Sequence, residues 1–259
     1  MVDVSVIIVN YNTKKLTLEC IDSIFSKTSG LQIEVIVVDN NSTDGSKEIL
    51  KSDNRIIFIG LSENIGFGRA NNKGVALSKG KYVFFLNSDT ILLNNAIKLF
   101  FDKMETCDKN ICCLGTLLLN KNMNRTHSYG KFPTKRFELV RQTFIGTILR
   151  YFGHKTSFYD YKVNTKKDFF KVEYITGADL FVRHSTIDNY GGFDEDFFMY
   201  YEETEMEYRY NKNKQYCYIY TVPQIIHLEG ASVKKSKSLR KRILALPGCF
   251  LYHQCPPAP

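Results

Sequence analysis

Short runs of apolar, often β-branched residues alternate with segments of helical spacing along the first 90 residues. Continuous apolar runs predict buried strands, at residues 4–9, 34–38, 55–61 and 81–86. Apolar positions at helical spacing predict helices, over residues 14–27, 46–52 and 66–79. Because the strands are apolar throughout and not only at every second position, the pattern predicts an α/β fold with a mostly parallel sheet and helices on both faces.

The second half of the chain is less regular. Residues 136–152 (RFELVRQTFIGTILRYF) are amphipathic, which fits either a core helix or a surface that meets an acceptor or a membrane. Residues 172–183 resemble a strand, and residues 190–198 a turn. In FFMYYEETEMEYR (197–209), four glutamates follow five apolar or aromatic side chains. Carboxylates in such a place are costly unless exposed, paired or functional, and an acidic first helical turn is the alternative explanation.

Composition and charge exclude several classes of protein. The chain is 44% hydrophobic and 24% charged, as in ordinary globular proteins. No apolar run reaches the roughly 18 residues of a membrane span, and the N-terminus lacks the features of a signal peptide, so we expect a cytoplasmic protein. Much of the net charge of +8 lies in KKSKSLRKR (234–242). This run fits a solvated tail or peripheral contact with the anionic inner face of the plasma membrane. No nucleic-acid-binding pattern is present, so no nucleic acid partner is expected.

The seven cysteines form no CxxC pair. The spacing therefore supports neither a zinc knuckle nor a thioredoxin motif. We expect reduced thiols with mainly structural roles.

Three of the predicted strands end in polar or aromatic side chains. Tyr11 follows the first strand, Asp39 the second, and the tripeptide Asn87-Ser88-Asp89 the fourth. Open sheets bind ligands beyond the carboxyl ends of their strands, so these clusters are expected to meet in one crevice. Asp89 is a candidate ligand for a divalent cation, which favours oxygen donors, and Asp39 is a candidate acceptor for a base or a ribose. Taken singly, each also fits an ordinary turn residue.

Two further residues carry candidate chemistry. Arg69 lies in the glycine-rich stretch 66–74 (GFGRANNKG), which lacks the spacing of the known phosphate-binding loops. Its guanidinium group is nevertheless suited to a diphosphate. His227 is a candidate ligand for a metal or a phosphate, although a single histidine also fits a structural position.

Several segments, in order, resemble those of family 2 inverting glycosyltransferases of GT-A fold, especially bacterial rhamnosyltransferase-like members. They are VSVIIVNYN, EVIVVDNNSTDGS, ENIGFGRANNKG, KYVFFLNSD, ITGADLFVR, GGFDEDFFMYYEETEMEYR and HLEGAS, between about residue 4 and residue 232. The resemblance implies a Rossmann-like GT-A domain with a mixed, mostly parallel sheet over residues 1–232. Within it, residues 1–95 would bind the nucleotide-sugar and residues 96–232 the acceptor, followed by a basic tail at 233–259.

The resemblance also implies a role for each matching position. The residues implied to contact the nucleotide and its diphosphate are Val9, Tyr11, Asp39, Arg69, Asn87 and Ser88. The residues implied to hold Mg²⁺ or Mn²⁺ are Asp89 and His227. The residues implied to line the acceptor pocket are Gly177, Ala178 and Asp179.

At two positions the sequence departs from the family pattern. The metal motif reads Asn-Ser-Asp, so its first carboxylate is missing and Asp89 remains as the acidic ligand. The family's Glu-Asp motif falls on Glu202-Glu203, which makes Glu203 the expected general base and Glu202 its alternative. Such a carboxylate would take the proton of the acceptor hydroxyl as it attacks. Glu205 and Glu207 are expected to be structural.

The resemblance implies transfer of a hexose, with inversion, from a nucleoside-diphosphate sugar to a hydroxyl of a cell-surface polysaccharide precursor. The pattern favours dTDP-rhamnose, then UDP-sugars, and a saccharide or lipid-linked saccharide acceptor. Two alternatives remain open. A nucleotidyltransferase would need a glycine-rich signature at the end of the first strand, which is absent. A non-catalytic nucleotide- or carbohydrate-binding protein would keep its binding without Glu202 and Glu203.

Overall fold

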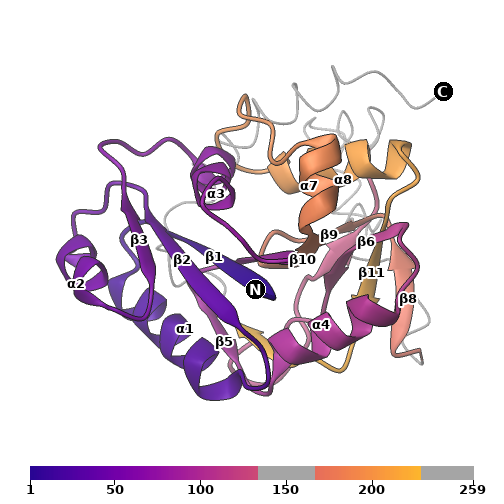
Figure 1. The fold of residues 1–259 in the computed structure, drawn as a ribbon, viewed down its shortest axis with the longest axis horizontal. Coiled ribbons are helices and arrows are strands. Elements are labelled where there is room, and N and C mark those ends of the chain that lie inside the picture. The colour runs from indigo at the N-terminus through magenta and orange to yellow at the C-terminus, as the bar shows by residue number, and fades with distance from the viewer. Residues whose placement is uncertain (134–166, 229–259) are drawn as a thin grey trace, which may run out of the picture.

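The computed structural model describes residues 1–133 and 167–228. Its centre is one mixed sheet (Figure 1). The strands of this sheet are β1 (Val4–Asn10), β2 (Ile33–Asp39), β3 (Ile57–Gly60), β4 (Tyr82–Leu86), β6 (Ile111–Gly115), β8 (Phe169–Val172), β10 (Asp179–Arg183) and β11 (Tyr216–Tyr220). Their order is β3-β2-β1-β4-β10-β6-β11-β8. The segment 136–152, predicted to be amphipathic, lies outside the described residues.

Most strands of the sheet run in the same direction. β3, β2, β1 and β4 are parallel neighbours, and β6 and β11 are also parallel to each other. β10 is antiparallel to both of its neighbours, β4 and β6, and β8 is antiparallel to β11. The prediction of a mixed, mostly parallel sheet is therefore confirmed.

Helices cover both faces of the sheet, as predicted (Figure 1). One apolar core lies under α1 (Lys14–Lys27), α2 (Ser46–Ser52) and α4 (Ala96–Thr106). The other lies under α3 (Phe67–Val75), α7 (His184–Tyr190) and α8 (Glu202–Lys212). The predicted helices over residues 14–27 and 46–52 have the predicted bounds, whereas α3 ends at Val75, before a turn. Within the described ranges, no helix combines the length and apolar character needed to cross a bilayer.

Two small two-stranded sheets lie outside the main sheet. β5 (Thr90–Leu92) pairs with β12 (Ile225–His227), and β7 (Tyr129–Gly130) pairs with β9 (Tyr174–Ile175). The strand-like run predicted at 172–183 is thus divided between strands of different sheets, separated by a turn at residues 176–178. The turn is needed because β9 pairs with β7 outside the main sheet, whereas β10 belongs to the main sheet.

A glycine determines how closely α3 approaches the sheet, and this generates a prediction. A methyl group added at Gly74 would lie 2.5 Å from Ile7 Cγ2 of β1. Alanine is normally better than glycine inside a helix by about 1 kcal/mol. We expect Gly74→Ala to lower the free energy of unfolding in urea by about 1–3 kcal/mol, because the overpacking outweighs that gain. The exposed neighbour Lys73 supplies the control, since Lys73→Ala should change stability by less than about 0.5 kcal/mol. A stabilised Gly74→Ala variant would contradict this packing.

Candidate active site

A buried asparagine joins the carboxyl ends of the first two strands. Asn10 Nδ2 donates to Asp39 Oδ1 at 2.6 Å and lies 2.9 Å from Ser46 Oγ, at the start of α2. Its Oδ1 accepts from Thr13 Oγ1 at 2.9 Å and from Thr17 Oγ1 at 2.7 Å, at the start of α1. Asn10 therefore holds two strand ends and two helix starts in fixed positions. No role was predicted for Asn10 from the sequence, because an asparagine after a predicted strand is also a common turn residue.

The predicted nucleotide pocket lies around this centre. Asp39 is fully buried, and its Oδ2 accepts from the backbone N–H of Ser42 at 3.0 Å. Val9 pairs with Val38 in the sheet, and Tyr11 is 49% exposed. The structure thus brings Val9, Tyr11 and Asp39 together at the carboxyl ends of β1 and β2. Contact with a nucleotide remains a prediction.

The predicted metal ligands meet at the small β5–β12 sheet. His227 Nε2 lies 3.2 Å from Asp89 Oδ1 and 3.5 Å from Asn87 Nδ2. The backbone N–H of Leu228 donates to the Asp89 carbonyl at 2.9 Å, which fixes the pairing of the two segments. Ser88 Oγ lies 3.0 Å from Thr13 Oγ1. The Asp89 carboxylate and the His227 imidazole are donors suited to a divalent cation such as Mn²⁺, so these two side chains fit the predicted metal.

The two candidate bases begin α8 and face different neighbours. Glu202 is only 4% exposed and faces Gly68 of α3. Glu203 faces Gly177: a methyl group added there would lie 3.7 Å from Glu203 Cβ and 3.8 Å from its Cδ. Neither Oε2 atom has a hydrogen-bond partner within the described ranges. Glu203, beside the predicted acceptor turn, is therefore better placed to act on an acceptor than Glu202.

Burial raises the pKa of both carboxyl groups. For Glu202 the charge of Glu203 adds to the effect of burial, and the pKa is raised well above its usual value. For Glu203, burial raises the pKa while backbone hydrogen bonds, including one from Gly177, partly lower it. A base with a raised pKa holds its proton more strongly at neutral pH, which suits proton transfer.

The other two glutamates of α8 have structural partners, as the sequence predicts. Arg209 binds Glu205 through two hydrogen bonds of 3.0 Å and 2.8 Å. Glu207 is fully buried, and its two carboxyl oxygens lie 3.0 Å and 3.1 Å from the backbone N–H of Ile175. The four glutamates therefore divide into two that are satisfied and two that are not.

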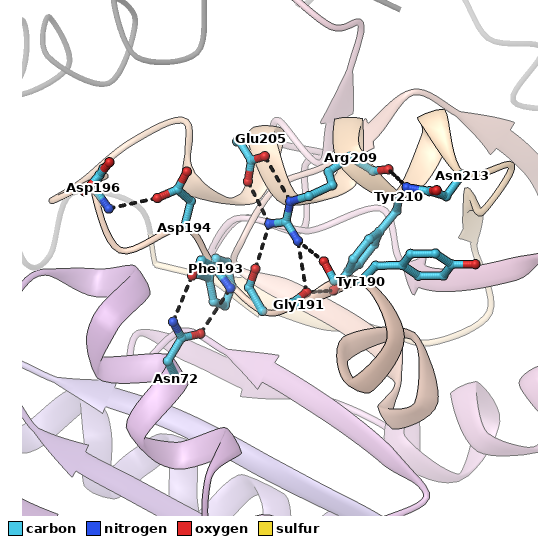
Figure 2. Close-up of polar contacts among 11 residues, drawn as sticks. Asn72, Tyr190, Gly191, Phe193, Asp194, Asp196, Glu205, Arg209, Tyr210 and Asn213 are labelled. Atoms are coloured by element: carbon cyan, nitrogen blue, oxygen red, sulfur yellow. Dashed lines mark hydrogen bonds and ion pairs between the residues drawn. The ribbon is translucent and has the colours of Figure 1, made fainter. Parts of the chain in front are cut away.

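Arg209 also fixes the loop that leads into α8, as Figure 2 shows. Its guanidinium group donates to the carbonyl oxygens of Tyr190, Gly191 and Gly192. Asn72 of α3 binds the same loop, donating to the Phe193 carbonyl at 2.8 Å and accepting from its N–H at 3.0 Å. The loop is thus held between α3 and α8 before it reaches the glutamates.

The last part of this loop has an unusual backbone. Tyr200 and Tyr201 have φ values of 70° and 72°, in the left-handed region that non-glycine residues seldom adopt. The Phe198 carbonyl accepts from the N–H of Phe67 at 3.0 Å, at the start of α3. A side chain at Gly66 would collide with this carbonyl. Such strain at a site is consistent with function.

Arg69 lies on the exposed face of α3. Its Nε donates to the Glu195 carbonyl at 2.5 Å. The structure therefore connects Arg69 to the loop before α8 and not to the Asp89–His227 pair. Contact with a diphosphate stays a prediction.

The predicted acceptor residues lie between the predicted metal motif and the candidate base Glu203. Ala178 accepts at its carbonyl from the N–H of Asn87 at 3.0 Å, and Gly177 lies against Glu203. Asp179 is fully buried, and its Oδ2 accepts from the N–H of Thr116 at 2.6 Å. Its Oδ1 has no partner among the described residues, and burial raises its pKa well above the usual range. One short turn therefore carries the metal motif on one side and the candidate base on the other.

Comparisons with known proteins indicate the family and the fold of the chain. The family whose pattern matches is described as "Glycosyl transferase family 2", over residues 5–169. The chain is 33% identical over 112 residues to glycosyltransferase GlyG of Streptococcus pneumoniae, covering 42% of this chain and 37% of that protein. It is 28% identical over 211 residues to the low-salt glycan biosynthesis hexosyltransferase Agl10 of Haloferax volcanii, covering 80% of this chain and 61% of that protein. The chain thus matches 37% of the length of one relative and 61% of the other, less than two-thirds of each.

Two solved structures share the fold. The mannosyltransferase PcManGT from Pyrobaculum calidifontis, in complex with GDP-Man and Mn²⁺, superposes with a TM-score of 0.66 at 15% identity, covering 99% of this chain and 65% of that one. GalNAc-T7 with UDP, GalNAc and Mn²⁺ superposes with a TM-score of 0.64 at 14% identity, covering 89% of this chain and 45% of that one. These likenesses confirm the predicted GT-A fold.

The Arg209 contacts generate a prediction about stability. Lysine cannot reproduce two parallel bonds to a carboxylate and several bonds to carbonyls. We expect Arg209→Lys to lower the free energy of unfolding by about 1–3 kcal/mol, measured by denaturant titration. Arg55, whose guanidinium group binds Asp53 and Asp22 on the surface, provides the matched control: Arg55→Lys should cost less than about 1 kcal/mol. Equal losses for the two variants would show that the loop does not depend on Arg209.

Proposed function

Since the chain belongs to glycosyl transferase family 2, we propose that it transfers a sugar from a nucleoside-diphosphate donor to a hydroxyl of a glycan acceptor, with inversion. The observation that carries the proposal is the turn at residues 176–178. It contacts Glu203 through Gly177 and binds the backbone of Asn87 through Ala178. The proposed proton acceptor and the proposed cation ligands would thus flank one short segment, as a displacement between two bound substrates requires.

Each residue has a part in the proposed reaction. Glu203 accepts the proton of the acceptor hydroxyl, and the hydroxyl oxygen forms a bond to the anomeric carbon of the donor sugar. The bond from that carbon to the diphosphate breaks on the opposite face, and the nucleoside diphosphate leaves with the electron pair. Asp89 and His227 would hold a divalent cation, which would stabilise the negative charge on the departing diphosphate.

The identities of the donor and the acceptor are proposed from the sequence motifs and from the names of similar proteins. The order of the sequence motifs favours dTDP-rhamnose as the donor, with UDP-sugars next. Two structural neighbours hold GDP-Man or UDP, which supports a nucleoside diphosphate without selecting its base. Relatives named for teichuronic acid and poly(ribitol-phosphate) chemistry support a saccharide acceptor from surface-glycan synthesis. We propose that this acceptor is lipid-linked and that the basic run at 234–242, outside the described residues, lets the protein meet an anionic membrane in the cytoplasm.

A binding panel is the first test of this function. dTDP, UDP, GDP, CDP and ADP are added with Mn²⁺ or with EDTA while thermal unfolding is followed. We expect one nucleotide with Mn²⁺ to stabilise the fold by about 2.7 kcal/mol at 100 times its dissociation constant. The matching nucleotide-sugars are then tried for transfer to saccharide acceptors. If no nucleoside diphosphate stabilises the protein, the proposed donor site is wrong.

The assignment of the base leads to a second prediction. Glu203→Gln should lower kcat/KM by about 100-fold or more while the donor still binds. Because burial raises the Glu203 pKa above its usual value, and only the ionised form can accept a proton, kcat/KM should rise with pH along a limb centred above the usual pKa of a glutamate. Glu48→Gln removes an exposed carboxylate on α2 and should leave the profile unchanged. A larger loss in Glu202→Gln than in Glu203→Gln would move the role of base to Glu202.

A further inference from the structure

An irregularity between β6 and β11 brings three cysteines together. Ile111 pairs with Tyr216, but Cys113 pairs with Cys217, so Cys112 is an extra residue on β6. Successive side chains of a regular strand point to opposite faces. A bulge disturbs this alternation and can redirect a side chain. Cys112 Sγ and Cys113 Sγ consequently lie 3.5 Å apart.

The third thiol completes a compact group. The sulfur atoms of Cys112, Cys113 and Cys217 all lie within 4.8 Å of one another. Tetrahedral zinc with Zn–S bonds of about 2.3 Å separates its sulfur ligands by about 3.8 Å. The three thiols therefore need only small side-chain movements to surround one ion.

Polar and charged groups surround these thiols, although each thiol is at most 1% exposed. The Cys217 thiol hydrogen-bonds to the carboxyl group of Glu207, and the Cys112 thiol donates to the Tyr216 carbonyl at 3.6 Å. Arg183 donates from Nε to the Ile111 carbonyl at 2.9 Å, directly before Cys112. A carboxyl group and a guanidinium group therefore lie beside the three thiols.

We propose that Cys112, Cys113 and Cys217 bind one thiophilic divalent cation of the Zn²⁺ class, with the carboxyl group of Glu207 beside the fourth coordination position. Binding forms three metal–sulfur bonds and releases the protons of the three thiols to solvent. The resulting complex carries one negative charge, which the Arg183 guanidinium offsets. The ion would connect β6 to β11 beneath α8, the helix that begins with Glu202 and Glu203.

This site is separate from the Asp89–His227 pair and does not depend on the proposed function. It is tested by metal binding to the reduced, metal-free full chain. We expect native mass spectrometry to show one Zn²⁺ per chain, and a titration with Cd²⁺ to saturate at one equivalent with an ultraviolet thiolate-to-metal absorption band. The unfolding temperature should rise with either ion, because the unfolded chain lacks the assembled site.

Variants identify which thiols bind. Cys113→Ser and Cys217→Ser should each weaken Cd²⁺ binding by about 100-fold or more, since even outer-shell changes cost 10–100-fold. Cys107→Ser, a thiol outside the cluster, should bind Cd²⁺ as the unmodified chain does. So should the double variant Cys249→Ser, Cys255→Ser.

The proposal is overturned if the unmodified chain takes up no Zn²⁺ and shows no Cd²⁺–thiolate band. It also fails if Cys113→Ser and Cys217→Ser bind as tightly as the unmodified chain, or if the double variant loses the band. Circular dichroism of the metal-free variants shows whether they fold. Should one serine variant fail to fold, the other variant and the mass of the unmodified chain decide the question.

Discussion

The 2.6 Å hydrogen bond from Asn10 to Asp39 joins the carboxyl ends of two parallel strands, and two chains of contacts lead from it to the start of α8. One passes from Thr13 to Ser88 and then from the backbone of the adjacent Asn87 to the turn beside Glu203. The other passes from Asn40 to the Gly66 carbonyl, and from the next residue to the loop that precedes the glutamates. Parallel strands alone bring the elements to one edge of the sheet. The buried amide sets their separation, because an unpaired polar group at that depth would be costly.

The four glutamates of α8 differ in whether their carboxyl oxygens have hydrogen-bond partners. Glu205 and Glu207 are buried but satisfied by Arg209 and by the backbone of Ile175. Glu202 is buried and Glu203 is half-buried, and each has one buried oxygen without a partner in the described part of the chain. Leaving a buried polar atom unpaired costs about 1–3 kcal/mol. A folded protein keeps such a cost where the free atom serves a ligand or a reaction, and the Glu203 side chain lies beside the turn that also supports the metal motif.

The sequence predicted what depends on neighbouring residues and missed what depends on distant ones. The helix at 14–27 and the first four strands were predicted because apolar periodicity is a local signal. The approach of Asp89 to His227 depends on two three-residue strands that pair across the chain, and only the family resemblance indicated it. The cluster of three cysteine thiols was not predicted, for a related reason. Adjacent cysteines on a strand are expected to point apart, and neither the bulge nor the arrival of Cys217 leaves a mark in the local pattern.

The position of β10 has a consequence for the order in which the chain is synthesised. β10 lies between β4 and β6 in the middle of the sheet, yet Asp179 is translated long after Leu86 has ended β4. At about 5–20 residues per second, the apolar edge of β4 (YVFFL) waits on the order of ten seconds for its partner. An uncovered edge of this kind invites pairing with other chains. The nascent chain is therefore exposed to aggregation in the interval between the synthesis of β4 and that of β10. The ribosome and its chaperones would have to shield the edge of β4 until β10 emerges.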